Sequence, residues 1–340
     1  MAVAYLLLLC LFLLLPPLLY RAGLPPRSEA YKSITSHVGS IGEIVRAIYQ
    51  DRSDGDIVFL GSSLTNAAIS QPTVHSALAA HLGRSAHTAV LALNWQGVDL
   101  QYYMLRDYLS THKLRLLVWN LPQPHSRVFD QPHRAAFSFI RFGEYPDALD
   151  GLAFHYRVAL FAEMVLGAPR QVLSRLRPNR LGPEAMDLNL EISHLGYYSQ
   201  PFVEDSLPPA VPQRDTDLLD LNSPLLRVEG PGLGPYNLHF ARKILALAAS
   251  HGCTVLLLHI PLDAEIGLRT VPEIADWSVE LHTDSRILAI PSADFFPGMD
   301  KSRVLHFYRD RHLNGNGRTA FTNRIIPSLL RAYDQANISR

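Results

Sequence analysis

Between residues 41 and 122, three short apolar runs alternate with helical segments, and this alternation constrains the fold more than any other feature. The runs are Asp56–Leu60, Thr88–Leu93 and Leu114–Trp119. A buried parallel strand is an almost unbroken apolar run, and parallel neighbours need a long crossover connection, usually a helix. The pattern therefore predicts an α/β fold: a three-layer sandwich with a central parallel sheet and helices on both faces.

Periodicity predicts the remaining elements of the same domain. The predicted helices are Ile41–Tyr49, Asn66–Leu82, Leu100–Leu109, Asn237–Ser250 and Ala320–Tyr333, and the later strands are Thr254–Ile260 and Ile287–Ile290. Residues 123–235 interrupt the pattern with many Pro, Arg and His and one apolar helix, Phe154–Leu166. We expect a long insertion here, either a cap over the active site or a partly unstructured segment.

The composition narrows the function classes. The chain has 340 residues, of which 48% are hydrophobic, so it can bury a substantial core. Its formal net charge is zero and it has no dense Lys/Arg block, which argues against nucleic acid as a partner. The fifteen His form no H-x-x-x-H pair, and Cys10 and Cys253 are not expected to form a disulfide. We expect no metal and no cofactor.

The N-terminus predicts a membrane segment. Residues 2–19 carry no charge and read AVAYLLLLCLFLLLPPLL. A run of about 18 apolar residues is near the lower limit for crossing a bilayer. We expect residues 1–20 to be a membrane anchor, with a cleaved signal peptide or a buried core helix as the alternatives. Residues 21–36 then form a linker that contains Pro and Ser, and the main domain spans residues 37–335.

The orientation of this segment is ambiguous in the sequence. Arg21, Arg27 and Lys32 follow the run and no Lys or Arg precedes it, which favours a cytoplasmic C-terminal side. Short N-terminal anchors that precede a large domain usually export that domain. We therefore expect an extracytoplasmic domain, periplasmic or at the cell surface, which is secreted if the segment is cleaved.

Polar residues lie at three positions beside predicted strands or helices. In open parallel sheets, sites form at the carboxyl ends of the strands. Ser63 lies directly after the first strand, in Gly61–Thr65, either as a nucleophile or as a simple helix cap. His312, with Asp310 nearby, precedes the last helix and can act as a base, or it belongs to a polar surface loop that ends in a capping Asn314.

The third position lies after the second strand. Residues Asn94 and Gly97 can supply an amide and a backbone N–H to an oxyanion, or they form an ordinary strand-to-helix turn. A lone His259 on the buried strand Thr254–Ile260 is expected to be a satisfied core residue.

Taken in order, these blocks resemble the SGNH/GDSL-like serine hydrolases. Gly61–Thr65 resembles the first family block, Gly-Asp-Ser-Leu-Thr, with Ser62 in place of Asp and Ser63 at the nucleophile. Asn94–Gly97 is similar to the second block, and Asp310–Asn314 to the last. The resemblance covers residues 41–122 and 236–333 and implies a flavodoxin-like SGNH fold. It implies Ser63, His312 and Asp310 as the catalytic set and Gly97, Asn120 and Asn94 as oxyanion donors.

Two blocks depart from the family. The usual spacing is Asp-x-x-His, whereas this chain has Asp310-x-His312, with Arg309 at the usual acid position. A spacing of two does occur in related alginate-acetylating proteins. The third block, Gly-x-Asn-Asp, is absent, and Asn120 stands at the matching strand end.

The variant Gly-Ser-Ser block and the N-terminal segment resemble one branch in particular. It contains membrane-anchored cell-envelope proteins similar to the D-alanine transfer protein of teichoic acid and to the alginate O-acetylation proteins. The resemblance implies ester hydrolysis or O-acyl transfer on a cell-envelope or extracellular polysaccharide, and a membrane-bound acyltransferase as partner.

Two alternatives remain open from the sequence. The chain is an inactive SGNH-like fold that binds polysaccharide or the acyltransferase partner, or it is an unrelated α/β scaffold. In the second case Ser63 and His312 would lie far apart.

Overall fold

The protein is an α/β structure, seen here in a computed structural model. The model describes residues 2–21, 26–34, 41–93, 97–120, 132, 135–163, 166, 218–219, 223–228, 232–273, 286–309 and 311–338. The α-helices are α1 (Ala2–Arg21), α2 (Ile41–Tyr49), α3 (Ser63–Ala68), α4 (Gln71–Leu82), α5 (Val98–Leu109), α6 (Tyr145–Ala148), α9 (Pro235–Ser250), α11 (Ser292–Phe295), α12 (Lys301–Leu305) and α13 (Gly315–Ile338), and residues 154–163 are also helical.

The strands and short 3₁₀-helices complete this description. The strands are β1 (Gly55–Ser62), β2 (Thr88–Leu93), β3 (Leu114–Asn120), β4 (Leu218–Leu219), β5 (Leu226–Val228), β6 (Thr254–Leu258), β7 (Val271–Glu273), β8 (Arg286–Leu288), β9 (Tyr308–Arg309) and β10 (His312–Leu313). The 3₁₀-helices are η1 (Arg27–Ser33), η2 (Ala136–Phe139), η3 (Phe142–Glu144) and η5 (Asp263–Glu265).

The central sheet has the strand order β2-β1-β3-β6-β8-β4. The first five strands run parallel, and β4 pairs antiparallel with β8 at the edge. In the middle of the sheet, Phe59 of β1 lies opposite Val90 of β2 and Val118 of β3. The predicted parallel sheet is therefore confirmed.

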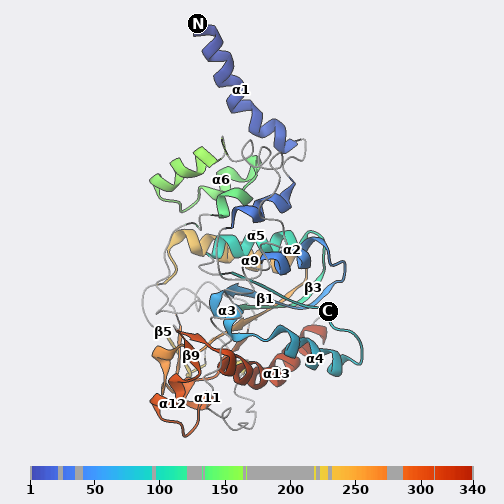
Figure 1. The fold of residues 1–340 in the computed structure, drawn as a ribbon, viewed down its shortest axis with the longest axis vertical. Helices are drawn as coiled ribbons and strands as arrows, with labels where there is room; N and C mark the ends of the chain where they lie inside the picture. Colours follow the sequence, from blue (N-terminus) through green and yellow to red (C-terminus); the bar gives the residue numbers. More distant parts are fainter. Residues whose placement is uncertain are drawn as a thin grey trace.

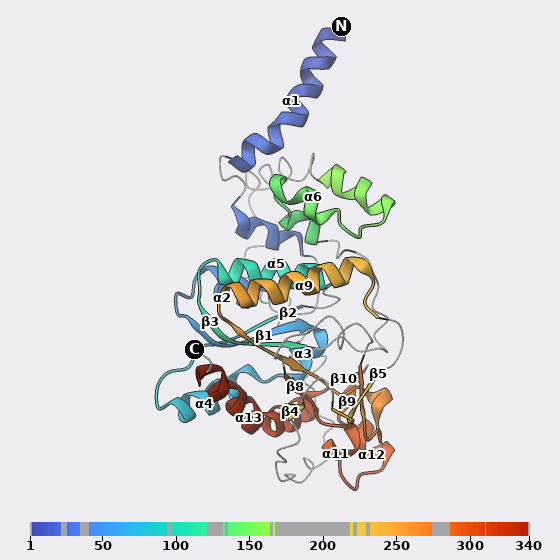
Figure 2. The same ribbon diagram turned by 180° about the vertical axis from the view of Figure 1, so that it is seen from behind.

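Helices cover both faces of this sheet. Figures 1 and 2 show α2, α5 and α9 on one face and α3, α4 and α13 on the other. The alternation of side chains along β1 explains why both faces need a cover. Val58 and Leu60 belong to one buried apolar cluster, whereas Ile57 and Phe59 belong to the other. The three layers predicted from the sequence are confirmed.

The predicted helix Asn66–Leu82 is wrong in one respect, because it is two helices. α3 ends at Ala68 and α4 begins at Gln71, with Pro72 in its first turn. Proline has no N–H to donate and clashes with a preceding turn, so it fits at the start of a helix and not in its interior. The chain therefore stops after α3 and starts a new helix.

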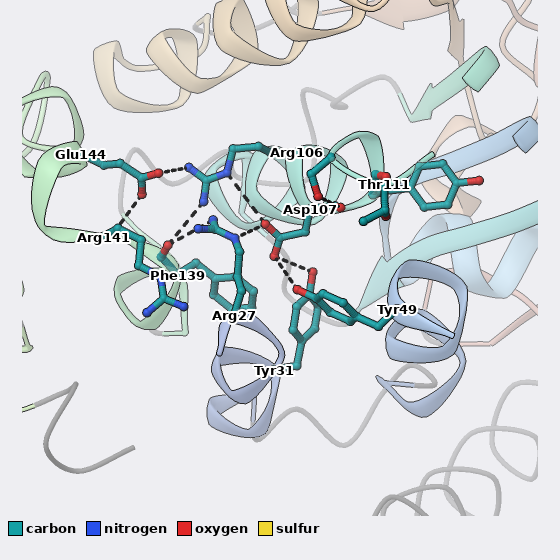
Figure 3. A network of polar contacts seen from close by, with 11 residues as sticks. Arg27, Tyr31, Tyr49, Arg106, Asp107, Thr111, Phe139, Arg141 and Glu144 are labelled. Carbon is teal, nitrogen blue, oxygen red and sulfur yellow. Dashed lines mark hydrogen bonds and ion pairs between the residues drawn. The ribbon is translucent and has the colours of Figure 1, made fainter. Parts of the chain in front are cut away.

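Residues 27–33 are not a spacer, although the sequence predicts a linker there. They form η1, in which Ala30 and Tyr31 are fully buried. Arg27 forms an ion pair with Asp107 of α5, and the hydroxyls of Tyr31 and Tyr49 donate to the same carboxylate at 3.1 and 3.3 Å (Figure 3). This segment is thus packed onto the domain.

A second arginine extends the same network to the insertion. Arg106 of α5 donates to Glu144 of η3 at 2.5 Å, and both Arg27 and Arg106 donate to the carbonyl of Phe139 (Figure 3). Burial raises the pKa of Asp107, and the Arg27 guanidinium partly opposes that rise. The described first part of the insertion is therefore anchored on η1 and α5. The cap predicted for residues 123–235 stays a prediction, because much of this range, including residues 167–217, lies outside the described residues.

α1 extends away from the rest of the molecule and contacts η3 at its base (Figure 1). Within the part of the chain that the structure describes, no helix combines the length and apolarity needed to cross a membrane. The membrane anchor stays a prediction.

Asp56, at the start of β1, joins three parts of the fold. It accepts two hydrogen bonds from Arg84, at 2.6 and 3.1 Å, one from the Tyr333 hydroxyl at 2.6 Å and one from the His87 N–H at 2.9 Å. Burial acts to raise the pKa of the Asp56 carboxyl, but these hydrogen bonds outweigh it and hold the pKa below its usual range. Burial and the contact with Asp56 raise the pKa of Tyr333 to about 12.

We expect Asp56→Asn to lower the free energy of unfolding by about 1–3 kcal/mol at pH 7, because charge-assisted hydrogen bonds are lost. The pKa of Asp56 is lower in the folded than in the unfolded state. Its carboxylate therefore contributes fully to the free energy of unfolding above the unfolded-state pKa of about 3.9. That contribution is lost as the pH falls through the folded-state pKa. Urea unfolding should therefore show a smaller difference in the free energy of unfolding between the two proteins near pH 3 than at pH 7. The exposed Glu43→Gln is the control, and an equal gap at both pH values would contradict the role of the ionised carboxylate.

We expect Arg27→Ala to destabilise the protein by about 2–3 kcal/mol, since it leaves the buried Asp107 carboxylate without its main countercharge. The effect is smaller than for a fully buried pair because the Arg27 side chain is 24% exposed. Urea unfolding measures it, with Arg46→Ala as the matched control. Arg46 lies 3.9 Å from Glu43 on the surface and should cost less than about 0.5 kcal/mol. An equal loss in the free energy of unfolding for the two variants would contradict the proposed contribution of the Asp107 network to stability.

Candidate functional site

The structure brings Ser63 and His312 together. Ser63 Oγ lies 2.8 Å from His312 Nε2, although the two residues are 249 positions apart in the chain. Ser63 follows β1 at the carboxyl edge of the sheet, and His312 begins β10 just before α13. The contact has the length of a hydrogen bond between a nucleophile and its base. The alternative of an unrelated scaffold, which requires the two residues to lie far apart, does not fit this geometry.

The two neighbouring serines have different roles. Ser62 is the N-cap of α3, and its Oγ accepts from the Leu64 N–H at 3.4 Å. Ser63 is the first helical residue, and its side chain, 8% exposed, faces His312 instead. The sequence left open whether Ser63 merely caps the helix, and the structure assigns the cap to Ser62.

Gly61 permits the close packing at the end of β1 that places Ser63. A Cβ at this position would lie 2.8 Å from Asn120 Cβ and 2.9 Å from Thr65 Cβ, and would collide with the Thr65 hydroxyl. Real Cβ atoms do not approach so closely, so only glycine fits between β3 and the first turn of α3. The absence of a side chain lets the strand end, Asn120 and the serine helix pack together.

A small hairpin presents His312. β9 and β10 pair antiparallel, with Arg309 opposite His312 and Tyr308 opposite Leu313, and Arg311 lies in the connection between them. Arg311 has a φ of 69°, a left-handed conformation that costs a non-glycine residue about 1 kcal/mol or more. The surrounding contacts must therefore hold the turn in place.

Asn314 supplies several of these contacts. It is fully buried, its Nδ2 donates to the His306 carbonyl at 2.6 Å, and its Oδ1 accepts from the Gly317 N–H at 3.0 Å. It therefore caps the start of α13, as one reading of the sequence predicted, and also ties the hairpin to α12. Gly317 has no room for a side chain, because a Cβ there would collide with the Phe307 carbonyl.

Two residues that the sequence analysis missed connect the serine helix to the histidine segment. Arg318 Nε donates to the Ala67 carbonyl at 2.8 Å, and Thr322 Oγ1 donates to the Ala68 carbonyl at 3.1 Å. The only signal in the sequence is that two polar residues four positions apart share one face of α13. These bonds join α3 directly to α13 and so fix Ser63 relative to His312.

The structure describes two of the three predicted oxyanion donors, Asn120 and Gly97. Asn120 ends β3 beside Gly61, and its Nδ2 donates to the Leu258 carbonyl at 3.3 Å. Gly97 is the residue before α5, and its carbonyl accepts from Gln101 at 3.1 Å. Asn94 and Asp310 lie outside the described residues, so their roles stay predictions.

His259 and Glu265 form a buried pair at the end of β6. Their Nε2 and Oε2 atoms are 2.9 Å apart and both side chains are buried. The sequence predicted a satisfied core histidine: its burial is confirmed, but its ring nitrogens make no hydrogen bond and its partner is the Glu265 carboxylate. The same loop accepts a hydrogen bond from the Tyr308 hydroxyl of the hairpin, at the Pro261 carbonyl. Burial and the nearby Glu265 raise the pKa of Tyr308 well above its usual range.

No family model matches the chain, and no curated protein matches its sequence. Among the described residues there is also no group of three or more His, Cys, Asp or Glu side chains that could hold a metal ion. The fold and the geometry alone define the class: an α/β protein with a serine–histidine pair at the carboxyl edge of a parallel sheet. Ser63 follows β1 and Asn120 ends β3, where the strand order reverses and ligands bind in such sheets.

We expect Gly61→Ala to destabilise the protein by about 1–3 kcal/mol or more, because its Cβ must push apart Asn120 and Thr65. The displaced turn should also weaken reaction of Ser63 with a serine-directed probe. The control is Gly143→Ala, since a Cβ at Gly143 meets nothing within 4 Å. Urea unfolding and probe labelling measure both effects, and a Gly61 variant that matches the control in both would show that the close approach is unimportant.

Proposed function

We propose that this protein hydrolyses or transfers ester-linked acyl groups through an acyl-serine intermediate at Ser63. The observation that carries the proposal is the 2.8 Å contact between Ser63 Oγ and His312 Nε2. A serine hydroxyl is a weak nucleophile unless a base removes its proton, and a histidine within hydrogen-bond reach is the usual base.

The proposed reaction has two halves. Ser63 Oγ attacks the ester carbonyl carbon as His312 Nε2 takes its proton, and His312 then returns that proton to the leaving alcohol oxygen. The acyl group remains on Ser63. In the second half, water or a sugar hydroxyl gives its proton to His312 and attacks the acyl carbon. The bond from the acyl carbon to Ser63 Oγ then breaks, His312 returns the proton to Oγ, and an acid or a new ester is released.

The other predicted residues have supporting roles in this proposal. Asp310 orients the His312 ring, and the Gly97 N–H and the Asn120 and Asn94 amides stabilise the oxyanion. Asn120 lies beside Gly61, near the end of β1 that precedes Ser63. A water acceptor makes the protein an esterase, and a sugar hydroxyl makes it an O-acyltransferase.

Two features support a flavodoxin-like SGNH fold in particular. The five parallel strands have the order β2-β1-β3-β6-β8, which is 2-1-3-4-5 when only these strands are counted. The nucleophile follows the first strand, and the base precedes the last helix. The polysaccharide substrate, the membrane-bound acyltransferase partner and the extracytoplasmic, membrane-anchored location rest on the resemblance in the sequence and on the N-terminal segment.

One observation favours a second candidate, an SGNH-like fold that binds polysaccharide or the acyltransferase partner without catalysis. The Asn120 amide, the proposed oxyanion donor, already donates to the Leu258 carbonyl. In that case the serine–histidine contact is retained for structure, and Ser63→Ala leaves biological activity unchanged.

A fluorophosphonate probe distinguishes the two candidates. We expect the full chain in detergent to be labelled at Ser63 and to hydrolyse a 4-nitrophenyl acyl ester. Ser63→Ala should abolish labelling, and both Ser63→Ala and His312→Ala should lower ester hydrolysis by about 10³-fold or more. Ser62→Ala is the matched control, because it removes a neighbouring hydroxyl that only caps α3 and should retain most of the labelling.

Circular dichroism must show that each variant is folded. Absence of labelling and hydrolysis in a folded parent protein would reject the acyl-serine proposal and favour the binding protein.

A further inference from the structure

Large exposed apolar side chains gather on two helices. Phe154, Val158 and Phe161 lie on the helix of residues 154–163 and are 80%, 55% and 55% exposed. The described side chains of α1 that are similarly exposed are Val3, Tyr5, Leu6, Leu7, Leu11, Leu14 and Leu18. Elsewhere in the described ranges, only Tyr49, Leu166 and Leu305 are large exposed apolar residues. Isolated residues of this kind are ordinary, but a gathered patch is typical of an interaction surface.

The helix of residues 154–163 is apolar on two sides. Phe154, Val158 and Phe161 are spaced by four and three positions, so they share its outer side. Leu160 is buried on the inner side, and Tyr156 packs against the same buried apolar cluster. A surface helix of a globular protein normally turns a polar side to water. The outer side of this helix therefore has the character of a covered surface.

The position of the helix of residues 154–163 indicates what covers its outer side. In both Figure 1 and Figure 2 this helix, coloured yellow-green, lies near the base of α1 and runs across the direction of α1. α1 itself contacts η3, which precedes this helix in the chain. The two helices that carry the exposed apolar side chains thus lie at the same end of the molecule (Figure 1), and residues 2–20 contain no charged side chain.

The charges on the helix fit a lipid headgroup region. Arg157 is exposed beside the apolar side chains. The one acidic residue, Glu163, lies within 3.4 Å of the Ser138 hydroxyl, on the side of the insertion. A basic group next to exposed Phe and Val is the pattern of helices that lie in a membrane interface.

We propose that residues 154–163 form an interfacial helix that docks on the surface of an anionic lipid bilayer, with Phe154, Val158 and Phe161 in the acyl-chain region and Arg157 at the phosphates. Docking of this kind does not require any helix to cross the bilayer. It supplements α1 as a second contact with the membrane and fixes the orientation of the sheet. It rests on the proposed membrane location but not on the chemistry at Ser63.

The test uses the full chain with Cys10→Ser, which removes the exposed native cysteine. The other native cysteine, Cys253, is buried, so an introduced exposed cysteine carries the environment-sensitive fluorophore. Phe161→Cys places the label on the proposed interface, and Leu305→Cys places it on α12, at the opposite end of the molecule (Figure 2). The protein is bound to vesicles of phosphatidylcholine and phosphatidylglycerol at 3:1, about a quarter anionic lipid, which suits a basic helix. We expect a blue-shifted emission and strong quenching by nitroxide-labelled lipid at position 161 and neither at position 305.

A second variant, Arg157→Glu, tests the electrostatic contribution of Arg157 to binding of the anionic bilayer. It should reduce the lipid quenching at position 161 in anionic vesicles, whereas Arg46→Glu on α2 should not. Equal quenching at positions 161 and 305, or a signal at 161 that depends on protein concentration without lipid, would overturn the proposal; the second result would indicate a second copy of the chain as the occupant. Fluorophosphonate labelling of Ser63 in the same samples separates this failure from failure of the proposed chemistry.

Discussion

The close approach at Gly61 is the constraint on which the site depends. Because this residue has no side chain, the end of β3 at Asn120 and the first turn of α3 at Thr65 pack against the end of β1. That packing directs Ser62 to the helix cap and Ser63 toward His312. A parallel sheet brings strand ends to one edge, but the missing Cβ determines how closely they meet there.

The last part of the chain holds the other half of the site in place. Arg318 and Thr322 bond to the carbonyls at the end of α3, while Asn314 pins the hairpin that carries His312. The serine and histidine are therefore held by a single helix, α13, that contacts both segments. In the proposed reaction such preorganisation matters, because a shift of about 1 Å between nucleophile and base costs much of the catalytic rate.

The opposite side of the sheet has a different function in the proposed architecture. There the Asp107 network joins η1, α5 and the first part of the insertion into one unit (Figure 3). This unit also contacts α1, and it includes the helix of residues 154–163 with its exposed apolar side chains. In this view one edge of the molecule carries the chemistry, and one end carries the proposed membrane contact.

The sequence by itself determined the main strands of the sheet and most of its helices, since side-chain period and strand length are local properties. The apolar runs predicted β1, β2, β3 and β6. The polar residues after β1 indicated Ser63 as a candidate, and those before α13 indicated His312. The tertiary structure decided which serine caps α3, that residues 27–33 pack onto α5, and that Arg318 and Thr322 support the site. The last two depend on contacts between residues about 80 to 250 positions apart. No local pattern encodes such contacts, because the buried partner of a polar side chain is set by packing.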